Sequence, residues 1–541
     1  MPIRVGCTLA VLLVGLVLAP SAGAETVMVP MPDGVELATD YFVPEGDGPF
    51  PVVVARSVYG RGAGGKLAPE LTKRGLALVV QDTRGRGTSK GEDRVFGDDG
   101  WGERQDGADT IDWVLEQPWC NGTVGTWGMS ALGIVQVLMA GATEKVTAQS
   151  IGVASSNFYG QTTYQGGVWR KSLIEGWTKA QKNTYIWEVF KGHPTYDEFW
   201  AEYNAEARAS KITAPALHIG GWWDIFGQGT LNNFTSRQHD GGAGARGTQK
   251  LIIGAWVHGP VKEVGDLVMP DNFNFDFGGY EKRFFDHWLL GEDNGIMDEP
   301  AVNYYTIGDV TRPDGPGNEW RTANDWPPFP TVETAYYLGA DNRLGTAPAT
   351  GNVKPLTYTY NPVDPCPTHG GQNLLIPAGP FDQRKQKQRS DVLTFASDVL
   401  AAPLEIAGRV TARLWVSTDA PDTDFTAKLI DVYPDGREIL MLDNIQRLKF
   451  RNGFTEADPL PPGDIGEVTI DLWSISLVFD EGHRIGLHVS SSNYPRFEKN
   501  PNSGDDFPTD DNLRVASNAI HVGEAHPSAL VLPVRAAGAS P

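Results

Sequence analysis

The sequence predicts an α/β domain followed by an all-β domain, and two patterns carry that prediction. From Glu25 to about Asp309, short apolar strand runs alternate with helical segments, which is typical of a mostly parallel sheet covered on both faces. After about Asn318, apolar and polar residues alternate with a period of two between Asp-Gly and Pro-Gly turns, which indicates antiparallel strands. The stretch DWPPFP (325–330) marks the border between them. A chain of 541 residues is also too long for one core.

The strands of the first domain are predicted from runs rich in β-branched and other apolar residues. They span residues 51–56, 76–82, 146–153, 216–221 and 250–256, with one more strand leading to Gly128. The segments between them are helical in pattern, and in DGADTIDWVLEQ the residues Ala108, Ile111 and Leu115 share one face. A further helix is expected directly after Ser130.

An aromatic-rich segment, residues 155–209, interrupts this alternation between two of the strands. Its runs IWEVF and TYDEFWAEYNAEARA are helical in pattern, so it predicts a helical cap inserted over the edge of the sheet. The period-two strands of the last part span 410–417, 425–432, 467–473 and 484–490. The predicted domains are therefore an α/β domain (25–154 and 210–317), a cap (155–209) and a β-sandwich (318–541).

The N-terminus carries the pattern of a cleavable secretory signal over residues 1–24. Arg4 precedes an apolar run, and Ala22-Gly23-Ala24 supplies an A-x-A cleavage site. An uncleaved anchor helix is the alternative, but it needs ~20 apolar residues. Cys7 precedes the apolar run, unlike a lipid-attachment cysteine. No later stretch is long and apolar enough to span a bilayer, so we expect a mature chain that is secreted or periplasmic and free of the membrane.

Net charge, cysteine content and ligand spacing indicate which partners, disulfides and cofactors to expect. The formal net charge of −22 argues against nucleic acid, whose phosphates require basic surfaces. Cys120 and Cys366, which remain after signal cleavage, fall in different predicted domains, so free thiols are favoured over one disulfide. The chain shows no His-x-x-x-His or Cys-x-x-Cys spacing, and we expect neither a metal nor another cofactor. The sequence indicates no oligomeric state.

Ser130 stands where a predicted strand meets a predicted helix, between Gly128 and Gly133. A serine on such a turn is exposed at the carboxyl edge of the sheet, and the helix N-terminus points at the reacting carbon. The usual pattern is G-x-S-x-G, whereas here the second glycine comes one residue later. A Gly-Ser turn is common in proteins, so this motif alone does not establish a nucleophile.

A nucleophilic serine needs a base and a carboxylate that orients the base. Asp224 follows the strand 216–221, and His258 follows the strand 250–256. Either one alone would be an ordinary loop residue. The order Ser130, Asp224, His258 at three successive strand ends is the order of α/β-hydrolase triads, and we interpret the three residues as a catalytic triad. Other histidines offer no competing site, because His218 lies inside a strand and His483 and His488 lie in the β domain.

The chain resembles the cocaine esterase-like (CocE/NonD) hydrolases, which are relatives of X-Pro dipeptidyl peptidases and α-amino acid ester hydrolases. The resemblance runs from about residue 27 to the end. The matching blocks are ARSVYGRG (55–62), VVQDTRGRGTSKGE (79–92), GTWGMSALG (125–133), GGWWDIF (220–226), IIGAWVHGP (252–260), FFDHWLLGEDNGIMDEP (284–300), DPCPTHGG (364–371), APDTDFTAKLIDVYPDGR (420–437) and SSNYPRF (491–497).

The resemblance implies an α/β-hydrolase domain with a helical cap and a C-terminal jelly roll, and it implies the same triad. It also implies that the Tyr59 hydroxyl and the Ala131 backbone N–H form the oxyanion hole. Tyr59 follows the strand 51–56, where such a donor loop is expected. From the residues themselves, Trp169, Trp223 and Phe226 are candidates for an aromatic substrate pocket, with packing in the core or the cap as the alternative for each.

The sequence departs from the family pattern at three points. Ala131 stands where the family often has a tyrosine, and the cap is short. In α-amino acid ester hydrolases, acidic residues that hold a substrate ammonium follow the triad aspartate, but here Ile225, Phe226 and Gly227 follow it. An apolar wall disfavours a free α-amine, whose desolvation would be uncompensated.

These observations favour a secreted serine hydrolase that cleaves carboxylic esters or amides of a small-molecule substrate through an acyl-enzyme. One alternative is a peptidase that releases X-Pro dipeptides, which would need an anionic pocket, for example from Glu175 or Glu188. An alternative of another class is a secreted binding protein with an inert hydrolase domain, against which the intact Ser/Asp/His set argues.

Overall fold

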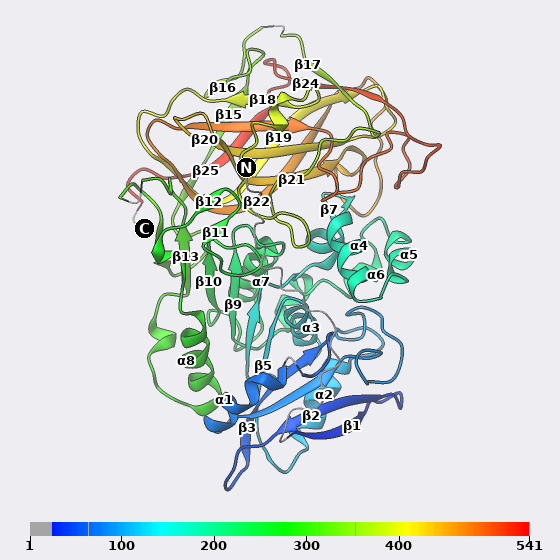
Figure 1. The fold of residues 1–541 in the computed structure, drawn as a ribbon, viewed down its shortest axis with the longest axis vertical. Helices are drawn as coiled ribbons and strands as arrows, with labels where there is room; N and C mark the ends of the chain where they lie inside the picture. Colours follow the sequence, from blue (N-terminus) through cyan, green and yellow to red (C-terminus); the bar gives the residue numbers. More distant parts are fainter. Residues whose placement is uncertain (1–23, 63, 313, 352, 540–541) are drawn as a thin grey trace, which may run out of the picture.

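The computed structural model describes residues 24–62, 64–312, 314–351 and 353–539 (Figure 1). The predicted signal segment, apart from Ala24, lies outside the described residues. Within these ranges, none of the helices has the length and apolar character needed to cross a membrane.

The first half of the chain forms one 10-stranded sheet in the order β1-β2-β4-β3-β5-β6-β9-β10-β13-β14. Its strands from β4 to β13 are parallel, and β1, β2 and β14 extend it antiparallel at the two edges. The bounds are β1 (Glu25–Pro30), β2 (Glu36–Phe42), β3 (Phe50–Ser57), β4 (Ala77–Asp82), β5 (Cys120–Met129), β6 (Ala148–Gly152), β9 (Ala216–Gly221), β10 (Lys250–Gly254), β13 (Val302–Thr306) and β14 (Glu319–Ala323).

Helices cover both faces of this sheet, because successive residues of each strand point to opposite sides. Val52 and Val54 of β3 pack in one cluster with α2 and α3, whereas Val53 packs in another cluster with α1 and α8. The helices are α1 (Ala68–Lys73), α2 (Asp106–Leu115), α3 (Ala131–Ala140), α7 (Gly227–Asp240) and α8 (Phe277–Leu290). The parallel sheet covered on both faces confirms the predicted α/β fold class.

The cap is built from short helices between β6 and β9. They are the π-helical turn η2 (Tyr159–Thr163), α4 (Lys171–Ala180), α5 (Ile186–Lys191), α6 (Glu198–Ala201) and η3 (Glu206–Lys211), with the hairpin β7 (Tyr164–Gln165) and β8 (Val168–Trp169). The run TYDEFWAEYNAEARA is less helical than predicted. It holds only α6 and part of η3, while the longest cap helix is α4.

The last part of the chain forms a β-sandwich above the hydrolase sheet, and the cap lies beside the junction of the two (Figure 1). One sheet has the order β16-β15-β25-β19-β24-β17, with β22 paired to β19, and the other has the order β18-β23-β20-β21. The bounds are β15 (Thr331–Leu338), β16 (Leu344–Gly345), β17 (Leu356–Tyr360), β18 (Leu393–Ala396), β19 (Leu404–Thr418), β20 (Asp424–Val432), β21 (Glu438–Arg447), β22 (Gly466–Phe479), β23 (Arg484–Ser490), β24 (Ala516–His521) and β25 (Ala529–Arg535). A C-terminal all-β domain is thus confirmed.

The boundary between the two halves differs from the predicted position at 317/318. β14 (Glu319–Ala323) pairs with β13 at the edge of the hydrolase sheet rather than with the sandwich. A strand of mixed apolar and polar residues is compatible with either sheet edge, so its sequence pattern did not reveal which sheet it joins. The cores also merge, because Trp223 and Leu231 of the α/β part pack in one cluster with Leu414 and Leu472 of the sandwich.

Candidate active site

Ser130 lies on a sharp turn between β5 and α3, with φ 56° and ψ −123°. A side-chain-bearing residue rarely adopts this conformation, and such strained residues cluster at functional sites. The turn is fixed on both sides, because Ser130 N donates to Gly152 O at 2.8 Å and Ser130 O accepts from Ile134 N at 2.9 Å. Ser130, which is half-buried, therefore lies at the carboxyl edge of the sheet.

The glycines around Ser130 are required by close backbone contacts. A Cβ on Gly128 would lie 2.4 Å from the carbonyl oxygen of Leu132. A Cβ on Gly133 would lie 2.8 Å from Ala154 Cβ and 3.0 Å from Gly152 O. Since a real Cβ does not approach so closely, the helix can pack against these strands only if both positions are glycine.

Asp224 lies in the loop after β9, and its carboxylate is fully buried. One oxygen, Oδ1, accepts the backbone N–H of Phe226 at 2.8 Å. The other oxygen, Oδ2, lies 2.5 Å from Nδ1 of His258. The carboxylate is thus held in one orientation by its own loop and faces the histidine with its free oxygen.

His258 follows β10 and joins the carboxylate to the serine. Its Nε2 lies 2.8 Å from Ser130 Oγ, while Nδ1 faces Asp224. The Phe226 ring and the imidazole lie in a T-shaped arrangement, at 6.0 Å between centroids and 72° between planes. The structure therefore brings together the three residues predicted as a triad, from the ends of β5, β9 and β10, in a continuous hydrogen-bonded chain.

Two predicted oxyanion donors lie at the same edge of the sheet. Tyr59 follows β3 and Ala131 follows β5, and these two strands are neighbours in the sheet. Ala131 is the first residue of α3, so its N–H has no carbonyl within the helix to bond. The Tyr59 hydroxyl accepts a hydrogen bond from Trp177 Nε1 at 2.9 Å.

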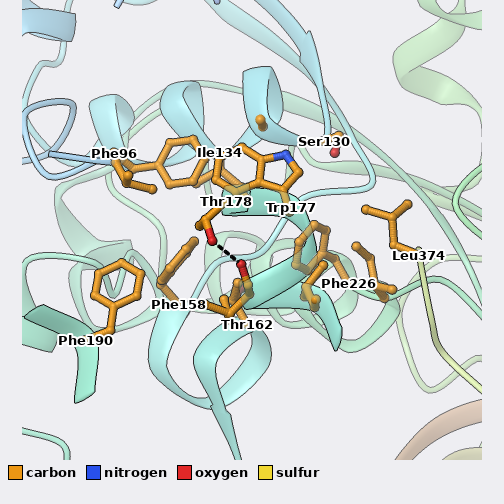
Figure 2. Close-up of a pocket in the computed structure, with 15 residues that line it drawn as sticks. Phe96, Ser130, Ile134, Phe158, Thr162, Trp177, Thr178, Phe190, Phe226 and Leu374 are labelled. Atoms are coloured by element: carbon orange, nitrogen blue, oxygen red, sulfur yellow. Dashed lines mark hydrogen bonds between the residues drawn. The ribbon is translucent and has the colours of Figure 1, made fainter. Parts of the chain in front are cut away.

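A pocket opens next to Ser130 between α3, the cap and the loop that carries Asp224 (Figure 2). The space between its walls, about 430 Å³, includes open solvent. Among the lining residues that the structure describes, none carries a charge. The lining residues include Ser130, Ala131, Phe226, Phe96, Ile134, Phe158, Leu173, Trp177, Phe190 and Leu374.

Of the three predicted pocket aromatics, only Phe226 lines this pocket. Trp169 is buried inside the cap, and its indole N–H donates to Glu175 Oε1 at 3.1 Å. Trp223 points toward the β-sandwich, where its indole N–H donates to Met441 O at 2.9 Å. Neither ring lines the pocket, and each indole N–H bonds elsewhere, which corrects the prediction for Trp169 and Trp223.

The pocket residues that the sequence did not reveal come mostly from the cap and the β-sandwich. Trp177 and Leu173 lie four residues apart on α4, so an apolar helical face was the available signal. Leu374 belongs to a loop of the sandwich, and no local pattern places it near Ser130.

The acidic residues considered for an ammonium pocket lie elsewhere. Glu175 accepts a hydrogen bond from Trp169 and forms an ion pair with Lys171 at 3.1 Å. Its negative charge is therefore already paired within the cap. Glu188 lies exposed on α5. Neither residue lines the pocket beside Ser130.

A fully buried arginine, Arg170, connects the three parts of the molecule behind the pocket. Its guanidinium donates to Gln161 O in the cap at 2.6 Å, to Ile225 O next to the Asp224 carboxylate at 3.1 Å, and to Gln372 O of the sandwich at 3.1 Å. Burial and the neighbouring Arg496 lower the pKa of Arg170, and the negative charge of Asp224 opposes that shift. The position of the Asp224 loop thus depends on contacts from both other domains.

The remaining histidines and cysteines lie apart from this site. Burial lowers the pKa of His218 to about 3, and its Nε2 pairs with Gln249. His483 and His488 pair with carboxylates of the sandwich. Cys120 is half-buried and Cys366 buried, each as a free thiol. Over the described ranges, no three His, Cys, Asp or Glu side chains gather in a way that could hold a metal ion.

Comparison with known proteins places the chain in a family. Residues 33–185 and 173–260 match the family model of X-Pro dipeptidyl-peptidases (S15 family), and residues 294–531 match that of the X-Pro dipeptidyl-peptidase C-terminal non-catalytic domain. The cocaine esterase of Rhodococcus sp. (strain MB1 Bresler) is 33% identical in an alignment that covers 94% of this chain and 98% of the relative. The chain belongs to the cocaine esterase-like (CocE/NonD) hydrolase family. It is a serine hydrolase.

Solved structures share the same fold. An aminopeptidase from the marine sediment archaeon Thaumarchaeota archaeon superposes with a TM-score of 0.79 at 24% identity, covering 95% of this chain and 96% of the other. An α-amino acid ester hydrolase gives a TM-score of 0.78 at 23% identity, covering 96% and 98%. This CocE/NonD-family chain therefore has the α/β-hydrolase fold with a C-terminal all-β domain, as the resemblance implied. Membership of a hydrolase family argues against the alternative of an inert binding protein.

Proposed function

We propose that this protein is a secreted serine esterase that transfers an uncharged, apolar acyl group to Ser130 and then to water. The hydrogen-bonded chain Ser130–His258–Asp224 is the observation that carries the proposal. His258 Nε2 takes the hydroxyl proton as Ser130 Oγ attacks the carbonyl, and the same proton then goes to the leaving alcohol. Asp224 holds the imidazole with its Nδ1–H toward the carboxylate and stabilises the imidazolium that forms.

The negative charge on the carbonyl oxygen requires donors on the opposite side. Ala131 N–H, at the N-terminus of α3, and the Tyr59 hydroxyl are the donors in this proposal. Water then attacks the acyl-enzyme with His258 as the base, and the acid product leaves. Burial raises the pKa of Tyr59, with the Trp177 hydrogen bond and Arg86 acting against that shift, so its hydroxyl keeps its proton at neutral pH and remains a donor.

The uncharged lining of the pocket supports an apolar acyl group. A substrate ammonium or carboxylate inside it would lose its hydration without gaining a partner, which costs several kcal/mol. The pocket-lining residues include five aromatic side chains, Phe96, Phe158, Trp177, Phe190 and Phe226, which suits aromatic and branched aliphatic acyl groups. For this reason we propose an ester substrate rather than an X-Pro peptide, whose free amine needs an anionic pocket.

The test is hydrolysis by purified mature protein of p-nitrophenyl esters and of an X-Pro p-nitroanilide, with Ser130→Ala as the matched variant. We expect the wild type to cleave apolar acyl esters, to react with a fluorophosphonate probe, and to lose both properties in Ser130→Ala. Ester hydrolysis retained by Ser130→Ala would refute the nucleophile. Preferential cleavage of the anilide would favour the peptidase. Export is tested separately, by expression of the full chain with detection of a mature N-terminus at Glu25.

A further inference from the structure

The Tyr59 hydroxyl is bonded to a residue of the cap rather than to its own domain. Trp177 lies on α4, 118 residues along the chain from Tyr59, and its Nε1–H donates to the phenol oxygen at 2.9 Å. The two rings also meet edge-on, at 6.4 Å between centroids and 79° between planes. A residue of the cap thus directly contacts the predicted oxyanion donor.

This contact determines what the Tyr59 hydroxyl can do. An indole N–H donates and cannot accept, so Trp177 occupies a lone pair of the phenol oxygen and leaves the phenol proton free. Tyr59 cannot return its proton to Trp177 and must direct it elsewhere. A hydroxyl that accepts one hydrogen bond also becomes a stronger donor in the next, because the bonds polarise each other.

The Trp177 ring is itself part of the pocket wall. It lines the pocket together with Ser130, and Figure 2 shows the indole nitrogen on the side of the ring nearer to Ser130. The indole also stacks on the Phe96 ring, at 5.8 Å between centroids and 19° between planes. A bound acyl group would therefore meet the same ring that holds the Tyr59 hydroxyl.

We propose that Trp177 is a positioning residue that holds the Tyr59 hydroxyl as an oxyanion donor and couples it to the fit of the acyl group. The proposal rests on the proposed function, because it needs acyl transfer at Ser130. An acyl group that leaves the indole in place keeps the donor aligned. An acyl group that displaces the indole still binds but reacts slowly, because the Tyr59 hydroxyl is no longer aligned. Poorly fitting acyl groups should therefore have a lower kcat as well as a higher KM.

The test is a double-mutant cycle on purified protein with p-nitrophenyl esters of increasing acyl size. Tyr59→Phe is expected to lower kcat about 10²- to 10³-fold, the usual effect of losing an oxyanion donor. Trp177→Phe keeps an apolar ring and removes the N–H, and we expect kcat to fall about 3- to 10-fold, the effect of one neutral hydrogen bond. The double variant should match Tyr59→Phe within about twofold, because without the hydroxyl there is nothing left to position.

A matched control separates positioning from packing. Leu374 lines the same pocket from the sandwich loop and makes no contact of this kind, so Leu374→Ala should raise KM, and its effect should multiply with that of Tyr59→Phe. If Trp177→Phe folds poorly, replacing the indole by benzothiophene removes the N–H with almost no change of shape. Thermal melting of every variant checks that the fold is intact.

The outcomes are distinct. Effects of Trp177→Phe and Tyr59→Phe that multiply, or a Tyr59→Phe variant with wild-type kcat, would overturn the inference while Ser130→Ala remains inactive. Activity in Ser130→Ala would instead overturn the proposed function. Under the inference, the spread of kcat across acyl sizes should also shrink in Trp177→Phe, which a purely structural role would not produce.

Discussion

Replacing Asp224 by asparagine should inactivate the enzyme for a reason that is visible in its hydrogen bonds. Oδ1 of Asp224 accepts the N–H of Phe226, and Oδ2 faces His258 Nδ1. An asparagine keeps the first bond only if its oxygen faces Phe226. Its NH₂ group then donates to Nδ1 of His258. The imidazole proton must therefore be on Nε2, the nitrogen that faces Ser130 Oγ. That nitrogen can no longer take the serine proton.

The magnitude follows from the cost of the alternative amide orientation and from the loss of the negative charge beside His258. The opposite amide orientation would leave the buried N–H of Phe226 unpaired, at a cost of about 1–3 kcal/mol, so the inactive tautomer is favoured by that amount. The charge-assisted bond to the imidazolium, worth about 1.5–3 kcal/mol, is also missing. At about 1.4 kcal/mol per tenfold change in rate, kcat should fall about 10²- to 10⁴-fold.

The assay is steady-state hydrolysis of an apolar p-nitrophenyl ester, with KM and thermal melting measured in parallel. KM and the melting temperature should change little, because asparagine fills the same volume and keeps both hydrogen bonds. Asp276→Asn is the matched control. That exposed aspartate also accepts a backbone N–H, from Gly279, but it lies at the start of α8. A kcat within about tenfold of the wild type in Asp224→Asn would refute the proposed orientation of the triad.

Three further predictions concern stability and the limits of the site. Gly128→Ala should lower both the melting temperature and kcat, because its Cβ would lie 2.4 Å from Leu132 O; an unchanged protein would contradict this, and Gly278→Ala, with open space around it, is the control. Trp223→Phe should destabilise the fold by about 1–3 kcal/mol by leaving Met441 O unpaired, yet keep kcat/KM within about twofold; a selective loss of activity would return Trp223 to the pocket. Burial and the Arg237 charge lower the pKa of His218 from 6.5 to about 3, so acid protonates the unfolded chain first, and stability should fall by up to about 1.4 kcal/mol per pH unit below 6.5. His218→Gln should therefore lose less melting temperature between about pH 6.5 and 4.5 than the wild type, and equal losses would refute this origin.

The positions of Ser130, Asp224 and His258 were predictable because each depends on a local pattern repeated in a known topology. Parallel strands end at one edge of a sheet, so residues directly after three strand runs had to lie near one another. The fold class followed from the same periodicities. Gly128 and Gly133 added a local signal for a tight turn at Ser130.

The pocket was less predictable, because it depends on side-chain direction and on contacts between distant segments. Trp223 is adjacent to Asp224 in sequence, yet its ring points into the sandwich, where it finds a hydrogen-bond acceptor. Leu374 reaches the pocket from a different domain. The strand β14 joined the hydrolase sheet through pairing with β13, which no pattern within its own five residues could specify.

The three carbonyls held by Arg170 bear on any attempt to shorten or recombine this enzyme. A truncated chain that stopped before the sandwich would retain Ser130, Asp224 and His258, but the guanidinium would lose Gln372 O and the pocket would lose Leu374. Replacing only the cap by that of a relative would change the contacts of the same guanidinium on the cap side, including its hydrogen bond to Gln161 O. Cap and sandwich should therefore be exchanged together, from the same relative, when new substrate ranges are sought in the laboratory.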